Sequence, residues 1–251
     1  MNRIPAIVRI VSAGLSLLVG YSCADNQTSP GVEPSPQAQA GAKIAPAQAG
    51  GGAPKLATSQ TGVTVTGSQS GSVTVPAEKG GYLIRYRYKG YGLKLEVQSV
   101  LGTLNMIPGG QSPGSDGWTR FDDLTSFNST ADQQYQLTAS EPFEIEFVRL
   151  PLRASPDTPP RSYSGRGLKV VGPVSLKAGS ASFKVSCPDL KQAGFVAELY
   201  DGRTAQNKGI IALGTGAKVD ETKKLQVPSA GDYLLKVNAN GRADWAIEVT
   251  Q

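Results

Sequence analysis

Two separate stretches of this chain carry the same alternation of apolar and polar residues. SGSVTVPAEKGGYLIRYRY, which starts at Ser70, aligns without a gap with VGPVSLKAGSASFKVSCPD, which starts at Val171. Later segments that start at Tyr135 and Tyr233 match in the same way after a short insertion, with Phe143 on Trp245, Ile145 on Ile247 and Phe147 on Val249. Because successive strand residues point to opposite faces, shared apolar positions at period two mean shared inward faces. The repeat therefore predicts two copies of one β fold.

The rest of the chain after Gly62 has the same period. Short runs such as LKLEV, FEIEF and WAIEV are bounded by Gly, Pro, Asn and Asp. Strands of this length and spacing are typical of antiparallel β-sandwiches, so the sequence predicts an all-β protein. We expect one β-sandwich at residues 62–150 and a second at residues 163–251, joined by a Pro-rich connector at residues 151–162.

The N-terminus has the features of an export signal, which we place at residues 1–23. A basic start is followed by an apolar run from Ile10 to Val19 and then by small and polar residues. The run is about half of the ~20 apolar residues that a spanning helix needs. The sequence therefore predicts a removable leader and no permanent span.

The end of the leader allows two modes of cleavage. Gly20-Tyr21-Ser22-Cys23 resembles a bacterial lipoprotein signal, in which Cys23 becomes the lipid-modified first residue. The protein would then be held on a membrane by that lipid anchor alone, in the periplasm or on the cell surface. In the alternative, an ordinary peptidase cuts after Ala24 and secretes a soluble chain that starts at Asp25.

Residues 24–61 separate the leader from the first sandwich. They are rich in Pro, Gly, Ala and Gln and contain no aromatic residue. Such a segment cannot bury enough apolar surface to fold. We expect a disordered linker that acts as a stalk.

Composition excludes several chemistries. The chain has no histidine, so Ser-His-Asp and Cys-His systems and imidazole metal sites are absent. Cys187, the only cysteine beyond the leader region, is expected to be a small buried residue. The net charge of +5 includes two leader arginines and is too small to indicate a nucleic-acid partner. We predict no enzyme activity and no cofactor; the loop GSDGWTRFDDL supplies only weak metal candidates, Asp116, Asp122 and Asp123.

The segment YLIRYRYK is the main candidate for a binding surface. Tyr82, Ile84 and Tyr86 fall on the predicted inward face, and the opposite face carries Arg85, Arg87 and Lys89. In one interpretation these cations are a solvated face or cross-strand partners of Glu144 and Glu146. In the other they form a basic strip for acidic polysaccharide or anionic lipid headgroups, flanked by Tyr88, Tyr91 and Trp118.

The second copy resembles the pre-peptidase C-terminal (PPC-like) modules of exported proteins. The resemblance rests on GLKVVGPVSLKAGSASFKVS, FVAELYDG and VPSAGDYLLKVNANGRADWAIEV. It implies a non-catalytic, jelly-roll-like module for adhesion, substrate recognition or secretion. Independently, the turn before Tyr233 predicts a tyrosine corner, and Trp245 is expected to cap the same core.

Together these features predict a non-enzymatic, exported and lipid-anchored binding protein. Its expected partner is an envelope or extracellular component, with polysaccharide favoured. The alternative is a structural or assembly scaffold that binds a protein partner through a sheet edge or the domain interface.

Overall fold

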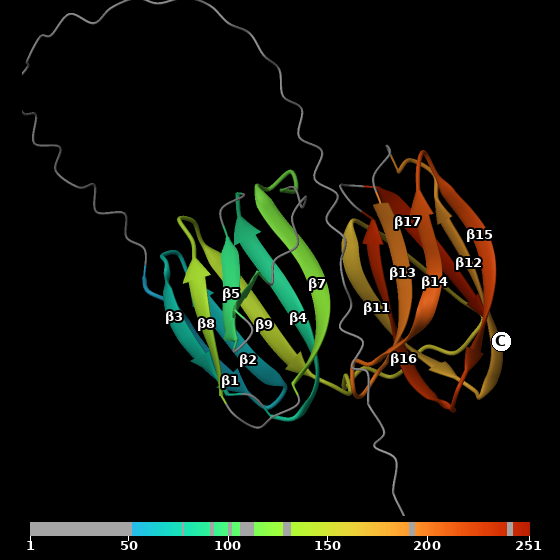
Figure 1. Cartoon of the computed structure of the whole chain (residues 1–251), viewed down its shortest axis with the longest axis horizontal. Coiled ribbons are helices and arrows are strands. Elements are labelled where there is room, and N and C mark those ends of the chain that lie inside the picture. Colours follow the sequence, from blue (N-terminus) through green and yellow to red (C-terminus); the bar gives the residue numbers. More distant parts are fainter. Residues whose placement is uncertain are drawn as a thin grey trace, which may run out of the picture. The chain divides into compact units, whose positions relative to one another are not determined.

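The computed structural model describes residues 52–76, 78–90, 93–99, 102–105, 113–127, 132–190, 194–239 and 243–251. The predicted leader, Cys23 and most of the predicted linker lie outside these residues. All regular elements in the described ranges are β-strands (Figure 1). None of these segments forms a helix of the length and apolar character that a membrane crossing requires.

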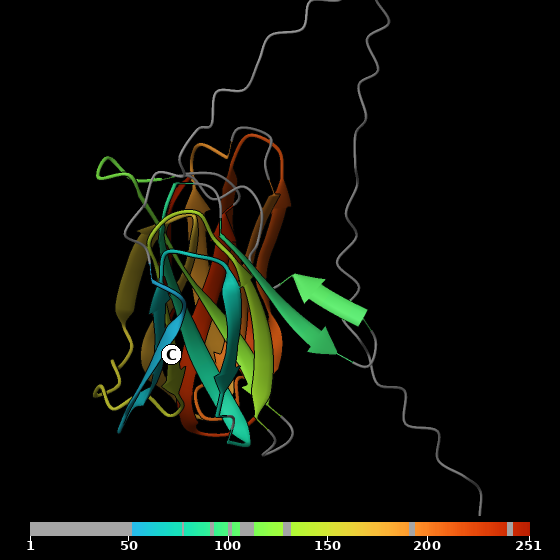
Figure 2. The same ribbon diagram turned by 90° about the vertical axis from the view of Figure 1, so that its left-hand side faces the viewer.

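In the described residues, the first sandwich contains nine strands in two antiparallel sheets. One sheet has the order β1-β2-β9-β4-β7 and the other the order β3-β8-β5-β6. The strands are β1 (Lys55–Ser59), β2 (Gly62–Gly67), β3 (Gly71–Val75), β4 (Gly80–Lys89), β5 (Lys94–Ser99), β6 (Gly102–Asn105), β7 (Trp118–Phe127), β8 (Gln133–Thr138) and β9 (Phe143–Arg149). Strand β5 pairs with β8 only from Lys94 to Val97, and the β5–β6 hairpin reaches out beyond its sheet (Figure 2).

As far as the structure describes it, the second sandwich repeats this arrangement without an equivalent of β1. Its sheets have the orders β10-β17-β12-β15 and β11-β16-β13-β14. The strands are β10 (Arg161–Arg166), β11 (Leu168–Leu176), β12 (Gly179–Cys187), β13 (Gly194–Asp201), β14 (Asn207–Thr215), β15 (Val219–Val227), β16 (Gly231–Ala239) and β17 (Asp244–Thr250).

The strand orders identify both sandwiches as jelly rolls. From β2 to β9 the chain alternates between the two sheets except at the β5–β6 hairpin, and β10 to β17 follow the same route. Eight strands wound in this way between two antiparallel sheets make a jelly roll. The predicted all-β class and the predicted internal repeat are therefore confirmed.

Strand register confirms the first part of the repeat and corrects the second. Val73 lies opposite Tyr135, and the aligned Val174 lies opposite the aligned Tyr233. Near the ends of the copies, however, Ile84 lies opposite Phe147, whereas its counterpart Val185 lies opposite Ile247 and not the expected Val249. The alignment of β9 with β17 was therefore wrong by two residues. A shift of two leaves the inward face unchanged, which is why sequence periodicity did not reveal it.

Each jelly roll has its own apolar core. Tyr82, Ile84 and Tyr86 are buried in the first core, as predicted, and the Tyr86 ring stacks on Phe121 with centroids 4.4 Å apart. In the second core Cys187 is buried and has a free thiol.

Two side chains of the second core have the predicted structural roles. The Tyr233 hydroxyl donates to the Ser229 carbonyl at 2.7 Å, which confirms the tyrosine corner. The Trp245 indole is buried and donates to the Gly167 carbonyl at 3.1 Å, so Trp245 does cap this core.

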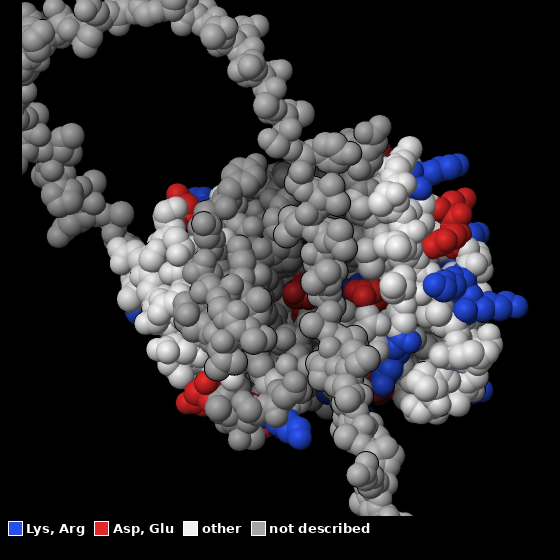
Figure 3. Space-filling view, viewed as in Figure 1, with Lys and Arg blue, Asp and Glu red and all other residues white. Residues whose placement is uncertain are grey.

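Surface charge on the second sandwich is mixed. On the face shown in Figure 3, basic and acidic side chains are interspersed over this sandwich and do not gather into one field. Strand β15 illustrates the pattern, because its exposed residues Asp220, Glu221, Lys223 and Lys224 include both signs.

The two jelly rolls pack against each other through an apolar cluster between strands β4, β7, β11 and β16. Leu83 and Leu124 of the first sandwich meet Leu234 of the second, together with Leu150 and Ala205. In addition, Leu168 of β11 is buried in the core of the first sandwich. The described residues of both sandwiches accordingly belong to one compact unit.

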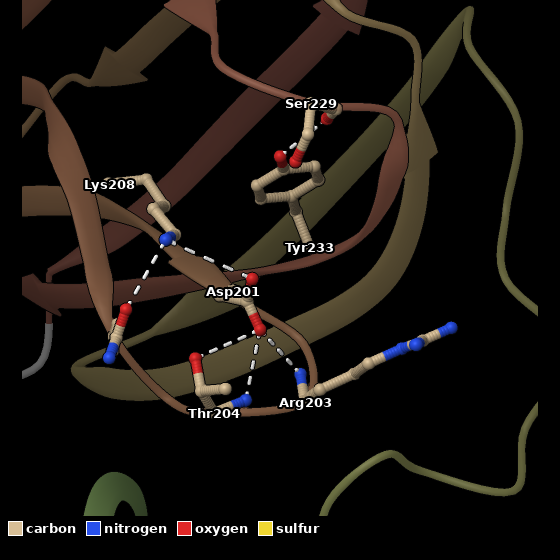
Figure 4. Close-up of polar contacts among 7 residues, drawn as sticks. Asp201, Arg203, Thr204, Lys208, Ser229 and Tyr233 are labelled. Carbon is tan, nitrogen blue, oxygen red and sulfur yellow. Dashed lines mark hydrogen bonds and ion pairs between the residues drawn. The ribbon is translucent and has the colours of Figure 1, made fainter.

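A turn of the second sandwich is shaped to contact the first. The Asp201 carboxylate accepts hydrogen bonds from the Arg203 and Thr204 backbone N–H groups and from the Thr204 hydroxyl, at 2.9–3.0 Å (Figure 4). Burial raises the pKa of Asp201, but these hydrogen bonds outweigh it and the pKa is lowered. The turn lies so close to Gly81 of β4 that a Cβ there would be 2.6 Å from the Thr204 carbonyl carbon. Gly81 therefore allows the two backbones to meet.

The N-terminal limit of the first sandwich differs from the expectation. Strand β1 lies inside the segment that we expected to be linker, and it pairs with β2 from Lys55 to Ser59. Every β1 side chain is exposed, so the strand is held by backbone hydrogen bonds and leaves no apolar alternation to detect. The other domain limits stay a prediction.

Candidate functional site

The outer face of the sheet β1-β2-β9-β4-β7 carries two rows of charged side chains. Residues directly opposite each other on antiparallel neighbours share a face. One row joins Glu146 of β9, Arg85 of β4 and Asp122 of β7, and the next joins Glu144, Arg87 and Arg120 of the same three strands. Alternation along β4 sends its tyrosines into the core and its arginines into these rows.

A pocket of about 290 Å³ lies over these rows. It is lined by Arg85, Tyr86, Arg87, Arg120, Asp122, Glu144, Glu146 and Lys169. Lys169 belongs to β11, so the second sandwich supplies one wall of a pocket built mainly by the first. The pocket therefore depends on the packing of the two jelly rolls.

The first row is neutralised by ion pairs. Arg85 Nη1 lies 3.1 Å from Glu146 Oε2, and Lys169 Nζ lies 3.8 Å from Asp122 Oδ2. The Val170 backbone N–H also donates to Asp122 Oδ2, at 3.4 Å. Burial raises the pKa of Asp122, and the nearby Lys169 and Val170 groups offset only part of this effect.

Arg120 is held by a carboxylate outside the pocket lining. Its two terminal nitrogens lie 3.1 and 2.5 Å from the Asp116 oxygens, which is the fork-like geometry of a bidentate pair. The hydrogen bond from Arg120, followed by one from the Trp118 backbone N–H, lowers the pKa of Asp116 to about 2. Both side chains are exposed, so this pair orients Arg120 more than it stabilises the fold.

Arg87 and Glu144 behave differently. They lie opposite each other across β4 and β9, yet no ion pair or hydrogen bond joins either side chain to another described residue. Instead the Arg87 guanidinium carbon lies 4.5 Å from the centre of the Trp118 ring, on the β7 side. This cation–π contact draws Arg87 away from Glu144 and leaves one cationic donor and one anionic acceptor on the pocket wall.

The structure brings together part of the predicted binding strip. Arg85 and Arg87 line the pocket, and Trp118 supports Arg87. Lys89 is exposed on the same face of β4 but does not line the pocket. The predicted cross-strand partnership is confirmed for Arg85 with Glu146; the second pair, Arg87 with Glu144, is in register without an ion pair.

Of the two predicted flanking tyrosines, the structure buries one and does not describe the other. Tyr88 was expected to flank the strip, and this was wrong: it is only 4% exposed and packs in the first core, edge-on to Phe121. Its position follows the same inward alternation as Tyr82 and Tyr86. Tyr91 lies outside the described residues.

The three metal candidates are not gathered around one point in the structure. Asp116 pairs with Arg120, Asp122 with Lys169, and Asp123 with Lys236 of the second sandwich. In the part of the chain that the structure describes, no group of three or more potential ligands could hold a metal ion.

Sequence reasoning missed Arg120 and Lys169 as pocket residues. Arg120 lies two residues after Trp118, so the alternation of TRFDDL would have placed it on the same face. Lys169 had no comparable signal, because its position in the pocket depends on how the second sandwich packs.

Comparisons with known proteins find neither a matching family model nor a matching curated protein. Among solved structures, the chain is similar to the tandem CBM22-1–CBM22-2 domains of Paenibacillus barcinonensis Xyn10C, with 11% identity, a TM-score of 0.25 and coverage of 81% of this chain and 92% of that chain. It is also similar to a triple jelly roll from an archaeal virus turret, with 13% identity, a TM-score of 0.31 and coverage of 80% and 59%. A cupin 2 conserved barrel domain protein from Leptotrichia buccalis matches with 12% identity, a TM-score of 0.23 and coverage of 82% and 91%. Likenesses this weak carry no functional argument, and the jelly-roll assignment rests on the strand order.

Proposed function

We propose that this chain is a non-enzymatic binding protein that recognises a polysaccharide of the cell envelope or surroundings. The observation that carries the proposal is the pocket on the outer face of the β1-β2-β9-β4-β7 sheet, where neither Arg87 nor Glu144 has an ion pair or side-chain hydrogen bond with another described residue. Sugars are bound through hydroxyl groups that donate and accept, so a wall offering both a donor and an acceptor suits them. The backbone of the pocket is rigid, because both residues lie on central strands of the sheet.

The pocket is proposed to bind and not to hydrolyse. Glycosidases need one carboxyl group kept protonated as an acid and a second carboxylate as nucleophile or base. Here Glu146 is ion-paired with Arg85 and Asp122 with Lys169, so neither carboxyl group is free to act as that acid. Glu144 is then left to accept hydrogen bonds from a ligand.

A glycan array with the purified protein tests the binding function. We expect a defined set of bound glycans, and we expect Arg87→Ala to abolish the signal while retaining the circular dichroism of the wild type. A folded wild-type protein that binds no glycan at high concentration would overturn the proposal. Unchanged binding by Arg87→Ala would show that the ligand site lies elsewhere.

We also propose that the protein is exported and tethered through a lipid on Cys23. The support is the leader sequence, the small residue Ser22 before the cysteine, and the linker that follows. Intact-mass analysis of membrane-derived protein is expected to show a diacylated Cys23 as first residue, and Cys23→Ala is expected to release the chain from the membrane. An unmodified start at Asp25 would instead establish a soluble secreted form.

A scaffold function is the second candidate, favoured by two apolar side chains on an edge strand. Ile210 and Leu213 of β14 are 42% and 65% exposed, and β14 ends its sheet. Edge strands accept partner strands through their free backbone groups. A stable complex with a protein partner that survives Arg87→Ala and is lost in an Ile210→Lys, Leu213→Lys variant would establish this function.

A further inference from the structure

The charges around the pocket cancel almost completely. Arg85 is paired with Glu146, Lys169 with Asp122, and Arg120 with Asp116. Among the described charged groups around the pocket, those left over are one guanidinium, Arg87, and one carboxylate, Glu144. The sequence alone suggested a basic strip for acidic polysaccharide, but in the structure the four cations of the lining are matched by three lining carboxylates and by Asp116 beside the pocket.

The two remaining groups require different things of a ligand. The Arg87 guanidinium only donates hydrogen bonds, and the Glu144 carboxylate only accepts them. A sugar hydroxyl does both, so two neighbouring hydroxyls satisfy the pair together. A carboxylate or sulfate group satisfies Arg87 alone, brings a like charge next to the unpaired Glu144 and leaves that acceptor without a donor.

Trp118 prepares Arg87 for this role. The indole ring lies beside the guanidinium, at 4.5 Å, and holds it on the β7 side of β4. A donor that is already oriented loses less conformational entropy when a ligand binds. Trp118 is therefore a positioning residue for Arg87.

We propose that this pocket binds a neutral sugar residue through two neighbouring hydroxyls, held between Arg87 and Glu144, and that Glu144 excludes acidic sugars. This inference rests on the proposed polysaccharide-binding function and specifies its ligand class. It also makes Glu144 the residue that determines specificity, because its charge repels the group that distinguishes an acidic sugar from a neutral one.

The test uses an array that carries neutral, uronic-acid and sulfated glycans, followed by titration calorimetry with the strongest neutral and strongest acidic glycan. We expect the wild type to bind neutral glycans, with affinity that changes less than about two-fold between low and high salt, since little net charge is neutralised. Arg87→Gln is expected to weaken binding about 10- to 100-fold, the loss of a hydrogen bond to a charged group. Lys89→Gln is the matched control, because Lys89 lies on the same strand face outside the pocket, and it should leave affinity unchanged.

The decisive variant is Glu144→Gln, which removes the charge and keeps the size of the side chain. We expect it to weaken neutral-glycan binding and to allow acidic glycans to bind. Trp118→Ala should weaken binding several-fold, and Trp118→Phe should restore part of the loss because a phenyl ring retains a cation–π contact.

Three outcomes separate the two proposals. Binding of neutral glycans that depends on Arg87 and Glu144 supports both. Salt-sensitive binding of acidic glycans, weakened equally by Arg87→Gln and Lys89→Gln, would overturn the neutral-sugar inference and leave polysaccharide binding standing. No binding to any glycan by folded protein would overturn the proposed function itself.

Discussion

Replacing Gly81 by alanine tests whether the two jelly rolls are held together by close backbone contact. A Cβ at this position would lie 2.6 Å from the Thr204 carbonyl carbon, 2.7 Å from the Ala205 nitrogen and 2.9 Å from the Arg203 oxygen, where ordinary contact begins near 3.4 Å. The obstructing atoms belong to backbone and cannot swing away as a side chain would. The turn from Arg203 to Ala205 must therefore retreat by 0.5–0.8 Å, the difference between these distances.

The expected cost follows from comparing two responses. Overpacking of this kind costs about 1–3 kcal/mol when the surroundings shift. Complete separation would expose Leu83, Leu124 and Leu234, at about 1.5–3 kcal/mol for each side chain. A local shift of the turn costs less, so Gly81→Ala is expected to lower the free energy of unfolding by about 1–3 kcal/mol.

Urea denaturation followed by circular dichroism measures this change. With a slope of about 2 kcal/mol per molar urea, the midpoint should fall by about 0.5–1.5 M. Gly231→Ala is the matched control, because a Cβ there has no neighbour within 4 Å, and it reports the effect of alanine on the unfolded chain alone. Equal midpoints for Gly81→Ala and Gly231→Ala would refute the close packing of the turn on β4.

Three further predictions concern single polar groups. Tyr233→Phe should lower the free energy of unfolding by about 1–2 kcal/mol in the same urea assay, because the Ser229 carbonyl loses its donor; an unchanged midpoint would contradict the tyrosine corner. NMR titration should give Asp116 a pKa of about 2 in the wild type and a higher value in Arg120→Gln, still below 3.8 because the Trp118 N–H continues to donate; equal values in both would contradict the bidentate pair. Asp122→Asn should raise the urea midpoint at pH 7, because the raised pKa of Asp122 means that its charged form destabilises the fold above that pKa. This gain should vanish as the pH falls below the ordinary value of 3.8, where both states are protonated, and a lower midpoint at pH 7 would contradict the argument.

Most of the fold could be predicted because its signals are local. Period-two alternation identified the inward faces of β4 and β12, and the repeat identified two copies of one sandwich before any strand pairing was known. The same alternation also predicts that Tyr88 is buried. Our prediction of Tyr88 as a flanking residue ignored this pattern, although the pattern correctly predicted the burial of Tyr82 and Tyr86. The sequence did not predict strand β1, because this strand is held by backbone pairing to β2 and not by side-chain burial.

The candidate site could be predicted only in part. Arg85 and Arg87 share a strand face, and the sequence suggested Glu144 and Glu146 as their partners across the sheet. Which pair would form depended on Trp118, whose ring attracts one arginine and not the other. Three side chains on three strands decide this, and no pattern within one strand contains that information.

The sequence by itself determined the all-β class, the repeat and the inward faces of strands such as β4 and β12, because the direction of a strand side chain depends only on its place in the alternation. The tertiary structure alone decided that Lys169 of the second sandwich would line a pocket of the first, that Leu168 would enter the neighbouring core, and that Asp123 would pair with Lys236. These contacts join residues far apart in the chain, and they exist only where two finished surfaces fit together. The neutralisation of Asp122 by Lys169 depends on that fit, and it is part of the reason that we propose a neutral and not an acidic sugar as the ligand.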